Sequence, residues 1–454
     1  MKDTVIHHPL GDKPPQARLI YGVDVVDGLR MLEDASIHTI CTSPPYWGLR
    51  DYGTGDEQIG QEDTPEAFIE GLVNVFREAK RVLRSDGTLW LNLGDSYAND
   101  SKWGGTTGGK HRSDLHGQPV GRARRVTGLK PKDMVGMPWR VALALQEDGW
   151  YLRSAMPWVK RNCMPESCKD RPSSAVEYIF LFAHPESGGR YYYDIHGFRA
   201  PLAAGSHTRL NQASFATQTG GEKDYGATDV NANRSARRGV ENLKARLEGG
   251  DATRQLRATD WFFMSVEDIQ AGGQVALRNN EGDPLAFVVN PKGYKGAHFA
   301  TWPTTLVEPM IKLSTSEAGV CATCGAPLNR VVVKTGAFHK CQNGPGTAAC
   351  HLEAKGKHGS SSALTSGMVP IKSTAGWESV CDCESGVSRA VVLDPFSGSA
   401  TTGMVALQQG RDYVGIDLNE DYLELARHRV LGMAAPKEAD EDTDGGTLDM
   451  FGGT

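Results

Sequence analysis

Hydrophobic residues recur along the chain with strand and helix periods in turn, and this alternation predicts an α/β protein. Residues 37–42 form a short run of mostly β-branched residues, which predicts a strand. A helix is expected from Thr64, because threonine is a favoured N-cap and Pro65 suits the first helical position. Its apolar positions have the spacing of one helical face: Phe68, Leu72, Val75, Phe76, Ala79, Val82 and Leu83.

The other elements follow from similar patterns and from turn residues. In the first half these are a turn at 85–87, a strand at 88–93, a helix at 133–148 that Gly149 ends, and strands at 150–159 and 176–183. A second unit closes the chain, with a strand at 390–393, a helix at 401–409, a strand at 412–416 and a helix from Asn419. Strands that alternate with helices predict a doubly wound, mostly parallel sheet.

Composition is that of an ordinary soluble protein. The 454 residues carry a formal net charge of −6, with 39% hydrophobic and 23% charged residues, so global disorder is excluded. The longest apolar runs are far shorter than the ~18–20 residues of a membrane helix. The first 13 residues lack the apolar core of a signal peptide, so we expect a cytoplasmic protein without membrane association. Nine cysteines then indicate thiols or metal ligands.

Charge is unevenly distributed. Residues 101–132 hold eight basic residues and one acidic residue in a glycine-rich context, and residues 199–257 hold ten basic and six acidic residues. Such segments are either solvated linkers or mobile arms that neutralise phosphates. Residues 437–449 carry six acids and one base, which is typical of a disordered, solubilising tail.

A stiff loop, Thr42-Ser43-Pro44-Pro45-Tyr46, follows the first predicted strand. Its two prolines remove two backbone donors and fix φ, and the end of a parallel strand is where open sheets bind ligands. The Ser43 hydroxyl, the Pro44 carbonyl and the Tyr46 ring suit a planar group that bears an amine. A rigid turn with a buried tyrosine is the alternative.

A loop of small residues, 394–403, follows a later strand and opens a helix. Small residues let the backbone approach a ligand, and Asp417, at the tip of the next strand, can bind ribose hydroxyls. This arrangement indicates an adenosine-bearing cofactor. The loop lacks the G-x-G-x-x-G spacing, which disfavours NAD, and the sequence has no P-loop motif for ATP.

Together these loops resemble the motifs of the DNA amino-methyltransferase family. Residues 42–46 match its catalytic motif, and residues 394–403 resemble its S-adenosylmethionine motif. Further segments that resemble the family are 42–53, 90–97, 164–171, 191–194 and 298–303. Because the catalytic loop precedes the cofactor loop, the chain resembles the β group. The resemblance implies a Rossmann-like fold with a circularly permuted motif order.

The resemblance also implies a domain organisation. It places the catalytic half at 18–199, with the basic loop 101–132 inside it, and a target-recognition insertion at 200–285. The cofactor-binding half follows at 286–432 and contains a Cys-rich insertion at 319–385. An acidic disordered tail ends the chain at 433–454.

Cofactor contacts are implied residue by residue. Phe396, Ser397, Gly398 and Ser399 would contact the methionine and sugar, and Asp394, Thr401 and Thr402 belong to the same motif. Asp417 would bind the ribose hydroxyls, Asp24 would contact adenine, and His298, Thr301 and Pro303 would lie beside the methionine carboxylate. Local capping or packing is the alternative for Asp24 and for the last three.

One residue departs from the family pattern, since Ala400 replaces a glycine. We expect Ala400 in the first turn of the following helix, where alanine is harmless. If the position instead required a positive φ, alanine would cost about 1 kcal/mol or more.

The implied reaction is direct methyl transfer to the exocyclic amine of a base swung out of a DNA duplex. Ser43 and the Pro44 carbonyl would accept the amine hydrogens, and Tyr46 would stack on the base. Carbon-5 methylation needs a Pro-Cys pair, which this sequence lacks. Serine in the first position resembles cytosine-N4 enzymes, so cytosine is expected and adenine-N6 stays open. The further alternatives are a non-catalytic DNA-binding protein and an enzyme acting on RNA or protein.

Four cysteines suggest a structural zinc site. Cys321-Ala-Thr-Cys324 resembles a zinc knuckle, and Cys381-Asp-Cys383 begins 57 residues after Cys324. Three residues between the two pairs could substitute as ligands: Cys341, Cys350 and His351. Reduced thiols of a cytosolic protein are the alternative.

Double-stranded DNA is the expected partner, through the basic residues of 101–132 and 199–257. A restriction endonuclease counterpart is a further candidate. Residues 447–451, Thr-Leu-Asp-Met-Phe, weakly resemble the peptide by which DNA-processing proteins bind the bacterial sliding clamp, and an ordinary disordered tail is the alternative.

Overall fold

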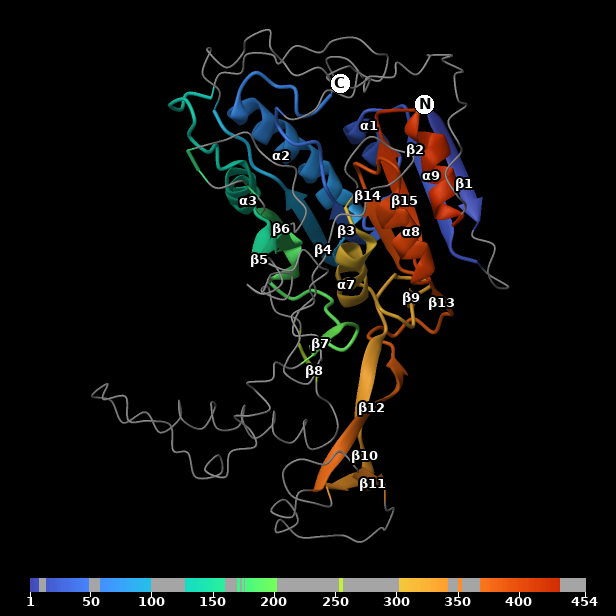
Figure 1. Ribbon diagram of the computed structural model, residues 1–454. Coiled ribbons are helices and arrows are strands. Elements are labelled where there is room, and N and C mark those ends of the chain that lie inside the picture. The colour runs from blue at the N-terminus through green and yellow to red at the C-terminus, as the bar shows by residue number, and fades with distance from the viewer. Residues whose placement is uncertain are drawn as a thin grey trace, which may run out of the picture.

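The fold is built on one large sheet (Figure 1). The computed structural model describes residues 1–7, 14–48, 58–98, 127–159, 170–171, 174, 176–201, 253–255, 302–341, 350–352 and 368–432. The basic segment 101–126, nearly all of the predicted insertion 200–285 and the tail 433–454 therefore lie outside the described residues. The predicted domain boundaries stay predictions.

The sheet has eight strands. Their order is β1 (Lys2–His7), β2 (Gln16–Tyr21), β15 (Asp412–Asp417), β14 (Val391–Asp394), β3 (Ile37–Thr42), β4 (Leu83–Leu93), β6 (Val176–Ala183) and β5 (Tyr151–Val159). The five strands from β2 to β4 are parallel. The outer strands β1, β6 and β5 pair antiparallel to their neighbours. The predicted doubly wound, mostly parallel sheet is thereby confirmed.

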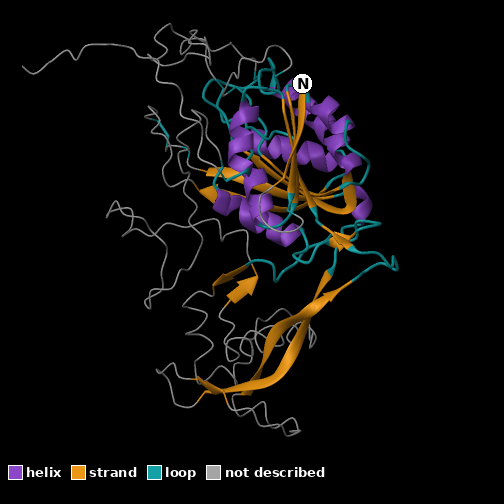
Figure 2. Cartoon of the chain, turned by 90° about the vertical axis from the view of Figure 1, so that its right-hand side faces the viewer, coloured by secondary structure: helices purple, strands orange, loops and turns teal. Residues whose placement is uncertain are grey.

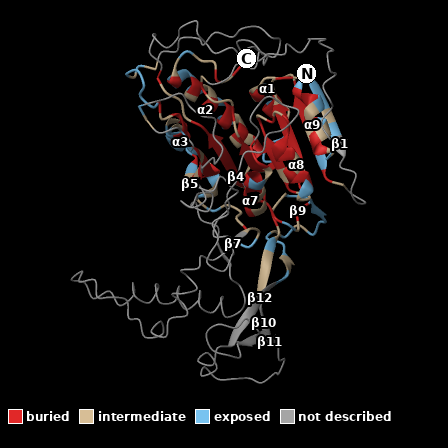
Figure 3. Cartoon of the chain, in the orientation of Figure 1, coloured by how far each residue is buried: buried red, intermediate tan, exposed pale blue. Residues whose placement is uncertain are grey.

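Helices cover both faces of the sheet (Figure 2). One face packs against α1 (Val25–Arg30), α2 (Pro65–Val82) and α3 (Met137–Glu147). The other packs against α7 (Thr304–Ser314), α8 (Thr401–Gln408) and α9 (Tyr422–Val430). Neighbouring residues of a strand enter opposite layers, as Val392 and Leu393 of β14 do. The buried residues therefore gather on both sides of the central strands (Figure 3).

Most predicted elements are present within a few residues of their expected ends. Helix α2 begins at Pro65, and the Thr64 hydroxyl accepts a hydrogen bond from the Ala67 amide. The predicted turn at 85–87 is wrong, because β4 runs without a break and absorbs these residues in an irregular pairing with β3. Helix α3 begins four residues later than expected, since Gly136 adopts a left-handed conformation with φ of +75°.

Outside the large sheet, a long two-stranded arm projects from the body (Figure 1). It pairs β10 (Asn329–Cys341) with β12 (Met368–Glu378), and the short β11 (Cys350–Leu352) extends it. At its base β9 (Val320–Cys321) pairs with β13 (Val387–Ser388). Two further short strands, β7 (Arg199–Pro201) and β8 (Thr253–Gln255), pair with each other, and η1 (Pro185–Ser187) is a single 3₁₀ turn. Within the described residues, no helix is long and apolar enough to cross a membrane.

Close packing of α8 on β15 predicts the effect of a substitution at Gly403. A Cβ atom there would lie 2.5 Å from Cε1 of Tyr413, so Gly403→Ala should overpack the contact and lower the free energy of unfolding by about 1–3 kcal/mol. We expect this loss of stability although alanine is about 1 kcal/mol more favourable than glycine in a helix interior. Gly71 of α2 is the matched control, because its nearest neighbour would lie 3.7 Å away and Gly71→Ala should stabilise. Urea unfolding measures both. Stabilisation by both substitutions would contradict the close contact.

Candidate active site

The site lies where the connections of the central strands diverge. From β14 the chain passes through α8 to β15 on one side, and from β3 it passes through α2 to β4 on the other. Strands β14 and β3 are parallel neighbours, with Leu393 opposite Ile40. Their carboxyl ends therefore place the loop after Thr42 beside the loop after Asp394, and such a divergence point is where open α/β sheets bind ligands.

Asp394 joins the two loops directly. Its carboxylate accepts hydrogen bonds of 2.7 Å from the hydroxyls of Thr42 and Thr402, and one of 3.2 Å from the Phe396 amide. Asp394 is 2% exposed, and this burial raises the pKa of its carboxyl to about 6, although the three hydrogen bonds oppose the shift. The ionised carboxylate thus fastens the end of β3 to the start of α8.

The turn after Asp394 is held by a second carboxylate. The Gly398 amide donates a 2.7 Å hydrogen bond to Oδ2 of Asp417, and the Asn419 amide donates one of 2.9 Å to Oδ1. Gly398 has a φ of +51°, and a Cβ atom there would meet nothing within 4 Å, so its backbone faces open space. Desolvation in the fold raises the pKa of the Asp417 carboxyl to about 6, although these two hydrogen bonds oppose the shift.

The serines of this turn face the protein interior. The Ser397 hydroxyl forms 2.8 Å hydrogen bonds with the hydroxyls of Tyr21 and Tyr413. The Ser399 hydroxyl accepts a 2.7 Å hydrogen bond from Arg429. Both serines are buried, and they tether the turn to β2, β15 and α9.

Ala400 corrects one expectation. It is the N-cap of α8 with φ of +56° and ψ of +45°, so the prediction that it lies in a harmless first turn is wrong. The chain has to reverse between β14 and α8, and Ala400 adopts a left-handed conformation that costs an alanine about 1–2 kcal/mol. The hydrogen bonds of Ser399 and Thr402 on either side hold it there.

Both loops line one crevice outside the carboxyl ends of the strands. Six of the residues predicted for the site border it: Asp24, Ser43, Pro45, Phe396, Gly398 and Asp417. Asn419 and Tyr422, which the sequence analysis did not single out, also line it. Asp24 has a second contact, since its carboxylate caps α1 by accepting from the Val26 amide at 2.8 Å.

None of the other described residues predicted for the site, Pro44 and Tyr46 of the catalytic loop among them, is a lining residue of the crevice. Asp394, Ser397, Ser399, Thr401 and Thr402 are buried behind the crevice and are not among its lining residues. Pro303 is the N-cap of α7. His298 and Thr301 lie outside the described residues. The individual ligand contacts therefore stay predictions.

The Tyr46 hydroxyl is held by two residues of neighbouring strands. It donates a 2.7 Å hydrogen bond to Glu177 of β6 and accepts one of 2.7 Å from the Asn92 amide of β4. Asn92 Nδ2 also lies 3.0 Å from Glu177 Oε2 and 3.4 Å from the Ser43 hydroxyl. A Cβ atom on Gly94 would lie 2.6 Å from the Tyr46 ring, so only glycine admits the ring in this position.

Neither of these two partners of Tyr46 was among the residues predicted for the site. Asn92 and Glu177 are almost fully buried, at 1% and 8% exposure. Polar residues inside otherwise apolar strands were the available signal, because a buried amide or carboxylate requires partners. Asn92 Oδ1 has no hydrogen-bond partner within the described part of the chain, which leaves a buried acceptor next to Ser43 and Tyr46.

The loop after β3 is suited to an amine, and the turn after β14 is suited to a nucleoside. Both lie where the connections of an α/β sheet diverge, and this arrangement is typical of group-transfer enzymes that use a nucleoside cofactor. Comparison with known proteins is more specific. The DNA methylase family of N6/N4 enzymes matches residues 37–322 and 385–428. The chain belongs to this family, which confirms the resemblance seen in the sequence, and it is a DNA amino-methyltransferase.

Two relatives match most of the chain. Type II methyltransferase M.Cfr9I of Citrobacter freundii is 33% identical over 409 residues, which cover 90% of this chain and 86% of that enzyme. Type II methyltransferase M.XycI of Xanthomonas campestris pv. cyanopsidis is 31% identical over 423 residues, covering 92% and 91%. Among solved structures, the cytosine-N4-specific PvuII DNA methyltransferase has a TM-score of 0.41 and 13% identity to this chain, and the match covers 92% of this chain and 89% of that structure.

The raised pKa of Asp394 predicts a pH dependence of stability. Between about pH 4 and 6, Asp394 keeps a proton in the folded chain that it has lost in the unfolded chain. The free energy of unfolding therefore falls as the pH rises through this range. Above the pKa of the folded chain, Asp394 causes no further change in stability. Asp394→Asn removes the titration. Between pH 4.5 and 7 the stability of the variant relative to wild type should therefore rise by roughly 1–3 kcal/mol. Urea unfolding at both pH values tests this, and parallel profiles of the two proteins would contradict it.

Proposed function

We propose that this enzyme transfers a methyl group from S-adenosylmethionine to the exocyclic N4 amine of cytosine in double-stranded DNA. The observation that carries the proposal is the placing of Ser43 and Gly398 on one crevice, with Ser43 as a neutral hydroxyl acceptor. An uncharged serine resembles cytosine-N4 enzymes, whereas adenine-N6 enzymes more often have Asp or Asn there. Adenine-N6 is therefore the alternative outcome.

The crevice residues fit S-adenosylmethionine. Asp417 and Asp24 both line the crevice, and their carboxylates would accept hydrogen bonds from the ribose hydroxyls and the adenine amine. Gly398 leaves room for a close approach of the ligand, and Phe396 adds an aromatic surface. When bound, the cofactor supplies a methyl group on a positively charged sulfur.

The protein residues act mainly by positioning the amine. An exocyclic amine is a weak nucleophile, because its lone pair is delocalised into the ring. Ser43 Oγ and the Pro44 carbonyl would accept its N–H hydrogens, which favours a tetrahedral nitrogen whose lone pair points at the methyl group. Asn92 supports this loop from behind, because its amide nitrogen lies 3.4 Å from the Ser43 hydroxyl and 2.7 Å from that of Tyr46.

Tyr46 would stack on the flipped base. Stacking offsets the few kcal/mol that leaving the duplex costs. Its hydroxyl is fixed by Glu177 and Asn92, and its ring lies against Gly94, so the ring keeps one orientation. A ring that is already ordered loses little entropy when the base stacks on it.

The names of the relatives support the biological setting. M.Cfr9I and M.XycI are both named Type II methyltransferases, which suggests a DNA substrate and a restriction endonuclease counterpart for this chain. Most of the basic residues proposed to contact phosphates lie outside the described residues, as does the tail segment 447–451 proposed for the sliding clamp.

Nucleoside mass spectrometry tests the choice of base. The chain is expressed in a host without DNA methyltransferases of its own, and the host DNA, RNA and protein are analysed for methyl groups. We expect N4-methylcytosine in DNA. Ser43→Ala is the control, and it should lower the methylation rate by about 100-fold or more through loss of one acceptor. N6-methyladenine alone would refute the choice of cytosine, and methylation confined to RNA or protein would refute the DNA substrate.

Removal of the Asp417 carboxylate should weaken cofactor binding. Asp417→Ala is expected to raise the dissociation constant for S-adenosylmethionine by about 10-fold or more, because charge-assisted hydrogen bonds are lost. Asp412→Ala is the matched control on the same strand, since Asp412 lies at its opposite end and accepts from the Gln16 amide. Calorimetry measures both variants, and an unchanged affinity of Asp417→Ala would reject the ribose assignment.

A further inference from the structure

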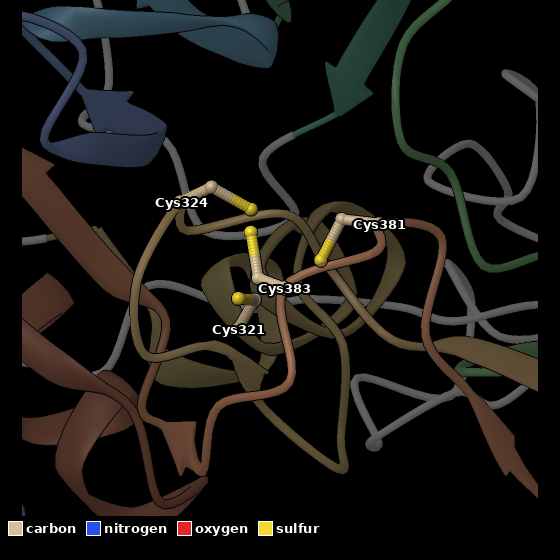
Figure 4. A group of neighbouring side chains, drawn as sticks. All are labelled: Cys321, Cys324, Cys381 and Cys383. Atoms are coloured by element: carbon tan, nitrogen blue, oxygen red, sulfur yellow. The ribbon is translucent and has the colours of Figure 1, made fainter.

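Four cysteines converge at the base of the arm, and we call them the four-cysteine cluster: Cys321, Cys324, Cys381 and Cys383. All four sulfur atoms lie within 4.8 Å of one another (Figure 4). All four residues are free thiols. Tetrahedral zinc with Zn–S bonds of about 2.3 Å needs sulfur atoms roughly 3.8 Å apart, so small movements would complete such a site.

The backbone around the first pair is shaped as a metal-binding turn. The Gly325 amide donates to the Cys321 carbonyl at 2.9 Å, and the Cys321 amide donates to the Ala326 carbonyl at 2.8 Å. Gly325 has a φ of +70°, which lets the chain reverse directly after Cys324. Strand β9 then pairs with β13, and this brings Cys381 and Cys383 beside the first two cysteines although they are distant in sequence.

Two serine hydroxyls lie against the sulfur atoms. Ser385 Oγ is 3.0 Å from the sulfur of Cys321, and Ser379 Oγ is 3.3 Å from that of Cys381. Metal-bound cysteines are thiolates, which accept hydrogen bonds from hydroxyl donors of this kind. The cluster therefore has both the ligands and the supporting contacts of a metal site.

Apolar packing does not explain the order of this segment. No residue from Thr374 to Arg389 is buried, and the second cysteine pair lies inside this stretch. Ordering exposed backbone costs conformational entropy that only strong contacts offset. A metal ion bound by four thiolates supplies such contacts where no hydrophobic core exists.

The cluster is also attached to the catalytic sheet. His38 of β3 accepts a hydrogen bond from the Val391 amide of β14 through Nδ1, and its Nε2 donates to the Gly325 carbonyl at 3.1 Å. Arg84 of β4 donates to the Cys324 carbonyl. Both residues lie at the starts of their strands, at the edge of the sheet opposite the crevice.

We propose that the four-cysteine cluster binds one structural zinc ion, which fixes the base of the β10–β12 arm to the sheet. The family match ends at residue 322 and resumes at residue 385, so the arm is an addition to the family's shared core. An isolated two-stranded ribbon is barely stable in water, and a metal ion at its base removes that weakness. The alternative ligands Cys341, Cys350 and His351 lie on β10 and β11, at the end of the arm far from the cluster. The proposal does not depend on which base is methylated.

Metal analysis of the full chain, purified without chelators, tests the proposal. We expect about one zinc per chain. Titration of thiols with an organomercurial should release this zinc into a chromogenic chelator as the thiols of the cluster react. The double variant Cys321→Ser, Cys381→Ser should lose the zinc, whereas Cys350→Ser, the control from the same arm, should keep it. Wild-type protein with almost no metal, or with iron instead, would overturn the proposal, and so would a double variant that keeps its zinc.

A second measurement tests what the ion does and requires no variant. Hydrogen exchange is compared before and after zinc is removed from the wild-type chain. Residues 319–328 and 379–388 should exchange at least 10-fold faster, while β14 should change little. Unchanged exchange at the base of the arm would show that no ion fixes it and would overturn the proposal.

Discussion

A single buried carboxylate organises this protein. Asp394 stands at the end of a central strand, and its two oxygens bind the Thr42 hydroxyl of one loop and the Thr402 hydroxyl of the other. An ionised carboxylate is tolerated at 2% exposure only because every side of it meets a donor. Since the loops are 352 residues apart in sequence, this contact makes one site out of two distant segments.

Motif residues divide between those that face the crevice and those that hold it in shape. Phe396, Gly398 and Asp417 line the crevice, whereas the serines beside Gly398 are fully engaged by protein side chains. On the catalytic side, Glu177 and Asn92 fix Tyr46 in the same way. Donors and acceptors that are held before the substrate binds need no reorganisation during the reaction, and this is the main source of rate in such an enzyme.

One strand connects the two functional ends of the molecule. Strand β3 ends at the catalytic loop, and near its start His38 binds both β14 and the turn of the four-cysteine cluster. The arm is therefore anchored to the strand that carries Ser43.

Local pattern determined the elements, the two loops and the enzyme family. Strand 37–42, the cap at Thr64 and the order of the motifs depend on residues close in sequence, and these signals were sufficient. Tertiary structure decided the rest. Ala400 adopts a positive φ because the connection from β14 to α8 demands it, and Ser397, Ser399 and Asp394 turn inward because neighbouring strands offer them partners. That Asn92 and Glu177 meet at Tyr46 was decided by the pairing of β4 with β6, since no sequence spacing records which side chains meet across a sheet.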